Sequence, residues 1–237
     1  MILDGLVTVI LSPVLLFQAI HLRRRALRLP EADGPRDGIG GGGPVLRILI
    51  IGDSSAAGVG VATQNLALAG QLAAALGPLH CVHWQLIATT GATTPTTLAA
   101  LEARTLPAAD IVLVILGVND VTRGGPMAGW LATHARLRAL LRDRTGARRL
   151  YISQIPPLGA FPLLPDPLRW VLGRRAQRFD AALRAALQSE ADTTYVPLPD
   201  TLNPGDMAED GFHPGAVIYA EWAKEMARRI ISDGPLR

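Results

Sequence analysis

The chain has 237 residues, of which 49% are hydrophobic and 18% are charged. At ~150 residues per domain, this length predicts one domain with an appendage, and the composition excludes a chain that is disordered throughout. The formal net charge of +3 and the isoelectric point near 9.6 are compatible with a nucleic-acid partner. The arginines are scattered, however, and no stacking aromatic residues lie between them. A solvated helix surface is therefore favoured, and no nucleic-acid partner is expected.

Cysteine occurs once in the chain, as Cys81. A single cysteine excludes a disulfide framework and any cysteine-based zinc site. Because Cys81 begins a strand-like run, we expect it to be a buried residue rather than a nucleophile.

The first predicted element is an apolar segment, residues 5–22, which carries no formal charge and is followed by four arginines, Arg23, Arg24, Arg25 and Arg28. A run of ~18 apolar residues is at the lower limit for crossing a bilayer. We therefore interpret residues 1–29 as a membrane-anchor-like segment with a basic flank. A signal peptide would carry its positive charge before the apolar run, not after it. The position of the arginines favours a C-terminal domain on the cytoplasmic side of the membrane.

Two alternatives to a spanning helix remain open for this segment. Pro13 and the short length also suit a helix that lies in the membrane interface. An ordinary helix of a soluble cytoplasmic protein is the other alternative. The pattern indicates nothing about the oligomeric state.

Residues 30–44 form the next segment, PEADGPRDGIGGGGP. It is rich in glycine and proline and has no apolar periodicity, which predicts a flexible linker. We therefore expect the folded domain to occupy residues 45–237.

From residue 45 onward, short apolar runs alternate with helical patterns. Leucines and alanines recur at helical spacing between the runs. Five buried strands alternating with helices predict an α/β fold, a three-layer α/β/α sandwich around a parallel five-stranded sheet. In such sheets the functional site lies beyond the carboxyl ends of the strands, so catalytic groups should directly follow strands. The predicted strands are residues 45–51, 81–88, 110–117, 149–153 and 193–198.

The first predicted strand runs into residues 52–58, GDSSAAG. A serine at a tight turn between a strand and a helix is exposed, and its N–H lies in the positive field of the helix N-terminus. Ser54 is therefore a candidate nucleophile, with a purely structural turn as the alternative. The segment is not a P-loop, because no Gly-Lys-Ser/Thr follows. It is not a Gly-x-Ser-x-Gly elbow either, because Ala56 occupies the last position.

Two further segments follow predicted strands. After the second strand comes TTGA, residues 89–92, in which Gly91 can offer an unhindered N–H to an oxyanion; a structural loop glycine is the alternative. After the third strand comes GVND, residues 117–120, in which the Asn119 amide is a candidate oxyanion donor. A turn-forming Asn-Asp pair is the alternative interpretation there.

The last candidate segment precedes the final predicted helix and reads DGFHP, residues 210–214. An aspartate three residues before a histidine can fold back and accept from the imidazole Nδ1–H, which leaves Nε2 free as a base. Asp210 and His213 are therefore candidate catalytic residues. Asp206 and Glu209 are the other acids that could orient His213, but neither has this spacing.

In this order, Gly-Asp-Ser, an isolated glycine, Gly-x-Asn-Asp and Asp-x-x-His resemble the four blocks of the SGNH (GDSL-type) serine hydrolase family, over nearly all of residues 45–231. The resemblance implies a flavodoxin-like sandwich in which Ser54 attacks the substrate, His213 is the base and Asp210 orients it. It also implies an oxyanion hole formed by the Ser54 N–H, the Gly91 N–H and the Asn119 side chain. No metal or organic cofactor is needed for this chemistry.

The resulting hypothesis is a serine esterase that acts on a small acyl ester by two-step acyl transfer. Asp53 and Asp120 are interpreted as hydrogen-bond acceptors that brace the site loops. The substrate class remains open among lysophospholipids, thioesters, aryl esters, short-chain acyl esters and acetylated sugars, although the apolar segment 156–165 favours an acyl chain. One alternative function is a membrane-tethered, non-catalytic binding module on a hydrolase scaffold. Another is a flavin or nucleotide binder that uses residues 52–60 as a phosphate loop.

Overall fold

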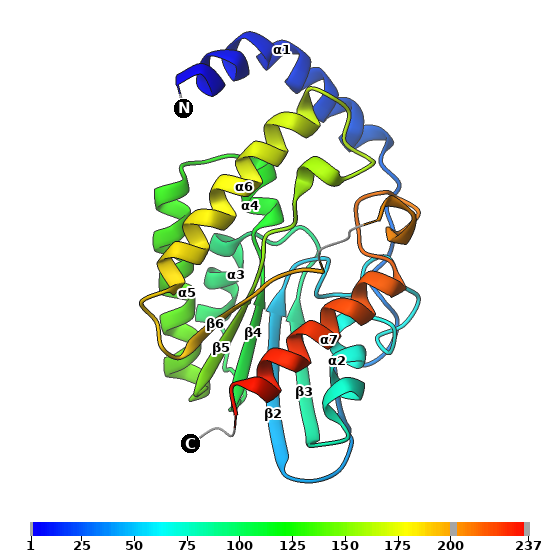
Figure 1. Cartoon of the computed structure of the whole chain (residues 1–237), viewed down its shortest axis with the longest axis vertical. Helices are drawn as coiled ribbons and strands as arrows, with labels where there is room; N and C mark the ends of the chain where they lie inside the picture. The colour runs from blue at the N-terminus through cyan, green and yellow to red at the C-terminus, as the bar shows by residue number, and fades with distance from the viewer. Residues whose placement is uncertain (1, 200–202, 235–237) are drawn as a thin grey trace.

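The computed structural model describes residues 2–199 and 203–234, with burial of the side chains described from Ile10 onward. Residue 1 of the predicted anchor-like segment and residues 200–202 and 235–237 of the predicted domain lie outside the described residues. Six strands form one sheet with helices on both of its faces (Figure 1). The strands are β1 (Asp37–Gly40), β2 (Val45–Gly52), β3 (Cys81–Ala88), β4 (Ile111–Ile115), β5 (Arg149–Ser153) and β6 (Thr193–Val196). The helices are α1 (Ile2–Arg25), α2 (Leu68–Leu76), α3 (Thr94–Glu102), α4 (Val118–Arg123), α5 (Met127–Thr145), α6 (Leu168–Leu187) and α7 (Ala216–Ser232), with short 3₁₀ turns η1 (Leu158–Ala160) and η2 (Pro204–Asp206).

The sheet has the strand order β1-β3-β2-β4-β5-β6. The pairs β3–β2, β2–β4, β4–β5 and β5–β6 are parallel, whereas β1 is antiparallel to β3. All five residues of β4 are buried, because helices cover both faces of a parallel sheet. The α/β architecture and the five predicted strands are confirmed. The expectation of a purely parallel five-stranded sheet is wrong at one edge, where β1 makes the sheet mixed and six-stranded.

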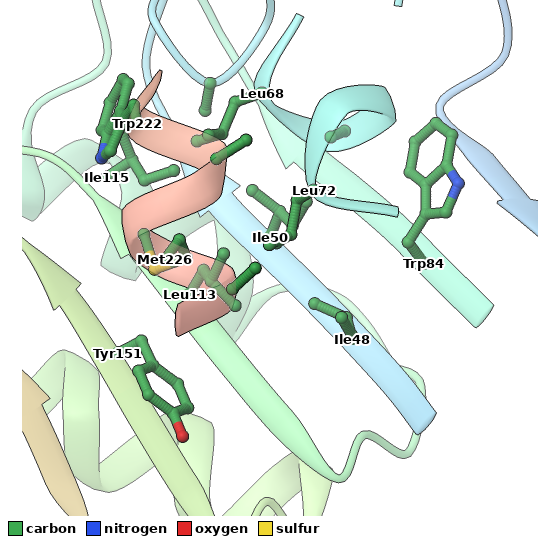
Figure 2. Close-up of a cluster of buried hydrophobic side chains, with 14 of the residues drawn as sticks. Ile48, Ile50, Leu68, Leu72, Trp84, Leu113, Ile115, Tyr151, Trp222 and Met226 are labelled. Atoms are coloured by element: carbon green, nitrogen blue, oxygen red, sulfur yellow. The ribbon is translucent and has the colours of Figure 1, made fainter. Parts of the chain in front are cut away.

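Two hydrophobic cores lie on the two faces of the sheet. One is formed where α2 and α7 pack over β2 and β4, and Figure 2 shows Leu68 and Leu72 of α2 opposite Ile50, with Met226 of α7 near Leu113. The other contains buried residues of α3, α5 and α6 on the opposite face. Successive side chains of a strand point to opposite faces, so the central strands β2, β4 and β5 contribute buried residues to both cores.

Residues 30–44 are not a flexible linker, and that prediction is wrong. This segment adds β1 to the sheet edge, and the Arg36 carbonyl accepts from the Leu86 N–H at 2.7 Å. The glycine that suggested flexibility instead permits close packing, since a Cβ added at Gly38 would lie 2.7 Å from Trp84 Nε1. The folded unit therefore begins before Val45.

Helix α1 continues through Pro13 and packs against the start of α6 (Figure 1). The Gln18 side chain donates to the Asp166 carbonyl at 2.7 Å and accepts from the Leu168 N–H at 3.1 Å. Leu22 packs against the core beneath α3, α5 and α6. Within the part of the chain that the structure describes, no helix is long and apolar enough to cross a membrane. The spanning form of the prediction for residues 5–22 is therefore not supported.

Candidate active site

The candidate site lies at the carboxyl ends of three neighbouring parallel strands. Ser54 follows β2, Gly91 follows β3, and Asn119 follows β4 at the start of α4. The turn into α4 is made possible by Gly117, whose φ of 133° is open to glycine and whose Cβ would lie 2.7 Å from the Ile155 side chain. His213 reaches the same edge from the loop before α7. The structure thus brings Ser54, Asn119 and His213 together, and it places Gly91 after the end of the neighbouring strand β3.

Ser54, His213 and Asp210 form a continuous chain of contacts. The Ser54 Oγ and His213 Nε2 atoms lie 2.9 Å apart, and His213 Nδ1 lies 2.5 Å from Asp210 Oδ2. The Asp210 Oδ1 atom accepts from the backbone N–H groups of Phe212 and His213, each at 2.9 Å. These bonds explain the three-residue spacing, because the aspartate braces the same turn that carries the histidine.

Asp210 is suited to remain ionised beside the imidazole. Burial raises its pKa, but the hydrogen bonds from the His213 side chain and from the His213 and Phe212 N–H groups outweigh burial, so the pKa lies below its usual value. A carboxylate that accepts three hydrogen bonds favours its charged form. Asp206, one alternative orienting acid, accepts from the Asn203 side chain instead. Glu209, the other, is exposed.

Asp53 braces the turn that carries Ser54 and also holds Asn119. Its Oδ1 atom accepts from the Ser55 N–H at 3.0 Å, and its Oδ2 atom accepts from Asn119 Nδ2 at 3.2 Å. The bond to Asn119 fixes which end of the amide is nitrogen and leaves its second N–H hydrogen for another acceptor. Burial raises the pKa of Asp53 to about 6, against the opposing effects of the Ser55 N–H, His213 and Asn119.

Asp120 ties α4 to the beginning of α3. Both of its carboxylate oxygens accept from the Thr94 N–H, at 3.0 and 3.1 Å, and Oδ2 also accepts from the Thr94 hydroxyl. Burial raises the pKa of Asp120, although these bonds oppose the shift. The expectation that Asp53 and Asp120 brace the site loops is confirmed.

Gly91 has a backbone conformation that suits a donor role. Its φ is +78°, a conformation that glycine adopts without steric cost. Within the described part of the chain, neither the Gly91 N–H nor the Ser54 N–H donates to an acceptor. Three further residues hold the Gly91 loop, and sequence analysis missed all of them: Glu31, Arg36 and Arg123. Their charged side chains bond to residues that are far away in the sequence, so no local motif would reveal these contacts.

A small cavity opens beside Ser54. Its volume is about 40 Å³, and its wall combines Ser54 and Asn119 with apolar side chains that include Phe161, Phe212 and Trp222. A water molecule needs ~10–15 Å³ by the same measure, so the cavity has room for a group of a few heavy atoms. No group of three or more His, Cys, Asp or Glu side chains that could hold a metal ion occurs in the described ranges.

The buried carboxyl of Asp53 predicts a pH-dependent stability difference. Its folded-state pKa of about 6 exceeds the unfolded value of ~3.9, so between these values the folded state retains the proton. The stability that Asp53 contributes should therefore be lost as the pH rises from about 4 to about 6, and the loss should persist above pH 6. Asp53→Asn cannot ionise, so its stability relative to wild type should rise by roughly 2–3 kcal/mol across that range. Urea unfolding at several pH values measures this, with exposed Asp143→Asn as the control; a pH-independent Asp53→Asn difference would contradict it.

Comparisons with known proteins address the family and the fold of this chain. A family model described as the GDSL-like lipase/acylhydrolase family matches residues 50–221. The lipase Lip_vut3 from a goat rumen metagenome superposes with a TM-score of 0.64 at 15% identity, covering 81% of this chain and 100% of that one. A family 3 carbohydrate esterase of Clostridium thermocellum gives 0.63 at 16% identity, with 80% and 96% covered. The esterase EstA from Pseudoalteromonas sp. gives 0.55 at 22% identity, with 78% and 97% covered. The comparison with curated proteins found no match.

At these identities the solved structures show a shared fold, whereas the family model covers well over half of the chain and shows the family. The comparisons support neither a non-catalytic module nor a flavin or nucleotide binder. The chain belongs to the GDSL-like lipase/acylhydrolase family and is a serine hydrolase that acts on ester bonds.

Proposed function

We propose that this enzyme hydrolyses carboxylic esters of short acyl groups, with Ser54 as nucleophile, His213 as general base and Asp210 as the residue that orients His213. The observation that carries the proposal is the contact of 2.9 Å between Ser54 Oγ and His213 Nε2, while Asp210 engages Nδ1 of the same ring. With Nδ1–H donating to Asp210, the neutral imidazole has Nε2 as its acceptor, facing the serine hydroxyl.

In the first step, the Ser54 hydroxyl attacks the ester carbonyl as His213 Nε2 takes its proton. The negative charge that develops on the carbonyl oxygen is bound by the N–H groups of Ser54 and Gly91 and by the free Nδ2 hydrogen of Asn119. Donors held in place before the reaction stabilise this charge without reorganisation. The imidazolium then protonates the leaving alcohol or thiol, and the acyl-enzyme remains.

In the second step, water attacks the acyl-enzyme. His213 takes a proton from the water molecule and then returns it to Ser54 Oγ as the acyl–oxygen bond breaks, which releases the carboxylic acid. Asp210 stays ionised throughout and stabilises the imidazolium.

The small cavity supports a short acyl group over the long chain of a lysophospholipid. Phe161 and Phe212 meet edge to face in its wall, with ring centroids 5.2 Å apart, and Phe161 is only 4% exposed. Closely packed rings resist displacement, because repacking a filled core costs ~1–3 kcal/mol. Acetyl to butyryl esters, including acetylated sugars and thioesters of that size, match this volume.

Removal of the nucleophile is the direct test of the mechanism. Ser54→Ala should lower ester turnover by ~10⁴-fold or more, as for other triad nucleophiles, with little change in melting temperature. A fluorophosphonate should label wild-type protein once, at Ser54, as mapped by mass spectrometry of the peptides. Labelling at Ser55 or Ser153 instead would show that the nucleophile is assigned wrongly.

A chain-length series tests the acyl cavity. With p-nitrophenyl esters, kcat/KM should peak between two and four carbons and fall at least tenfold by eight carbons. A deeper apolar site would show the opposite trend, since each buried CH₂ gains ~0.8 kcal/mol. Phe161→Ala should move the optimum to longer chains, whereas Leu79→Ala, at an exposed position, should not. A wild-type optimum at eight carbons or more would refute the short-acyl assignment.

We also propose that α1 lies against an anionic lipid surface, such as the cytoplasmic leaflet. Two observations support this: Ile10, Leu16 and Phe17 are 68%, 62% and 69% exposed, and the helix ends in three exposed arginines. Apolar side chains beside basic ones suit binding in the headgroup region of a membrane.

Vesicle co-sedimentation tests the lipid-surface proposal. Full-length protein should sediment with phosphatidylserine-containing vesicles and much less with phosphatidylcholine alone. Ile10→Ser combined with Phe17→Ser should reduce binding at least tenfold, and Leu79→Ser, an exposed leucine elsewhere, should have no effect. Equal sedimentation of all three proteins would rule out α1 as the lipid-binding element.

A further inference from the structure

The Gly91 loop depends on side chains outside the loop for its orientation. Its own backbone bonds are few: the Thr89 N–H donates to the Gly52 carbonyl at 3.2 Å, and the Ala92 N–H donates to the Thr89 carbonyl at 3.0 Å. Thr89 and Thr90 are exposed, so little packing holds them. The N–H group that is to meet an oxyanion must nevertheless point in one direction before substrate arrives.

The peptide unit between Thr90 and Gly91 carries this N–H, and the peptide on each side of it is anchored. On the N-terminal side, Glu31 Oε1 accepts from the Thr90 N–H at 3.0 Å and from the Thr90 hydroxyl at 2.6 Å. On the C-terminal side, Arg123 Nη2 donates to the Gly91 carbonyl at 2.7 Å. Because peptide units are planar and turn only about φ and ψ, fixing both neighbours limits the rotation of the unit between them.

Both anchors are charged groups with defined positions of their own. Glu31 forms an ion pair with Arg36. The Nη1 atom of Arg36 in turn donates to the carbonyl of Ala88, the last residue of β3, at 2.7 Å. Burial raises the pKa of Glu31, but the bonds to Thr90 and the charge of Arg36 outweigh it and lower the pKa below its usual value. Hydrogen bonds to an ionised group are roughly twice as strong as neutral ones.

Arg123 is the last residue of α4, the helix that begins one residue before Asn119. Its bond to Gly91 therefore links the segments that carry two of the three oxyanion donors. Neither Glu31 nor Arg123 forms a hydrogen bond with Ser54, His213 or Asp210 in the described part of the chain.

We propose that Glu31 and Arg123 are positioning residues for the oxyanion hole, which hold the Gly91 N–H from opposite sides of the loop. This rests on the proposed function, in which Gly91 is a donor. It also gives the segment before β2 a part in catalysis, since Glu31 and Arg36 belong to residues 30–44.

Glu31→Ala and Arg123→Met in the full-length chain test the proposal. Each should lower kcat by ~10–100-fold, the range expected when a reacting group is misplaced by about 1 Å, with KM changed less than threefold. Affinity for a trifluoromethyl ketone, which mimics the tetrahedral state, should fall by the same factor as kcat/KM. Glu31→Gln retains an acceptor for the Thr90 N–H and should recover most of the activity.

The matched control is Glu102→Ala, which removes an exposed glutamate paired with Arg136 at 3.3 Å; it should leave kcat unchanged. Circular dichroism confirms that each variant is folded at the assay temperature, and if Glu31→Ala does not fold, Arg123→Met carries the test. Wild-type kcat in the folded variants, or a loss confined to KM, would overturn the inference while leaving the esterase mechanism intact. Failure of wild-type protein to hydrolyse esters or to be labelled at Ser54 would instead overturn the proposed function.

Discussion

The register of three parallel strands determines where Ser54, Gly91 and Asn119 of the candidate site lie. Gly52 at the end of β2 is paired with Ala88 at the end of β3 and with Ile115 at the end of β4. Ser54, Gly91 and Asn119 each follow within four residues of those paired ends. A slip of one residue would turn the buried side chains of a strand to the opposite face. The packing of both cores therefore fixes the site geometry, although no core side chain needs to take part in the chemistry.

On this framework, three aspartates hold the loops of the candidate site in place. Asp53 joins the turn that carries Ser54 to Asn119, Asp120 joins α4 to Thr94, and Asp210 closes the turn that carries His213. All three side chains are buried, and a buried carboxylate is costly unless it accepts several hydrogen bonds. Asp210 accepts enough bonds to lower its pKa, whereas Asp53 does not. The difference agrees with their proposed roles, because only Asp210 must support a positive charge on the adjacent ring.

Much of this organisation could be predicted from the sequence. Buried parallel strands are continuous apolar runs, so β2 to β6 were recognisable, and the spacing of Asp210 and His213 is a local pattern. β1 was not recognisable, because four residues of a glycine-rich stretch carry no apolar alternation. Glu31 contacts a residue 59 positions away and Arg123 one 32 positions away, and such polar contacts leave no periodic signal. For α1, apolar composition is the same for a helix in a bilayer and a helix packed on α6, so sequence alone could not separate them.

The contact between Ser54 and His213 joins residues 159 positions apart, whereas His213 and Asp210 are three apart. During synthesis the strand that presents the serine is complete long before the histidine has been added to the chain. An N-terminal fragment or a nascent polypeptide thus exposes a hydroxyl with no base beside it. Ser54 and His213 can meet only when the loop before α7 closes over the sheet. The packing of α7 against α2 and β2 offsets the conformational entropy that the chain loses in this closure. Hydrolytic competence is in this way a property of the finished fold, and it cannot appear before the loop that carries His213 has been synthesised.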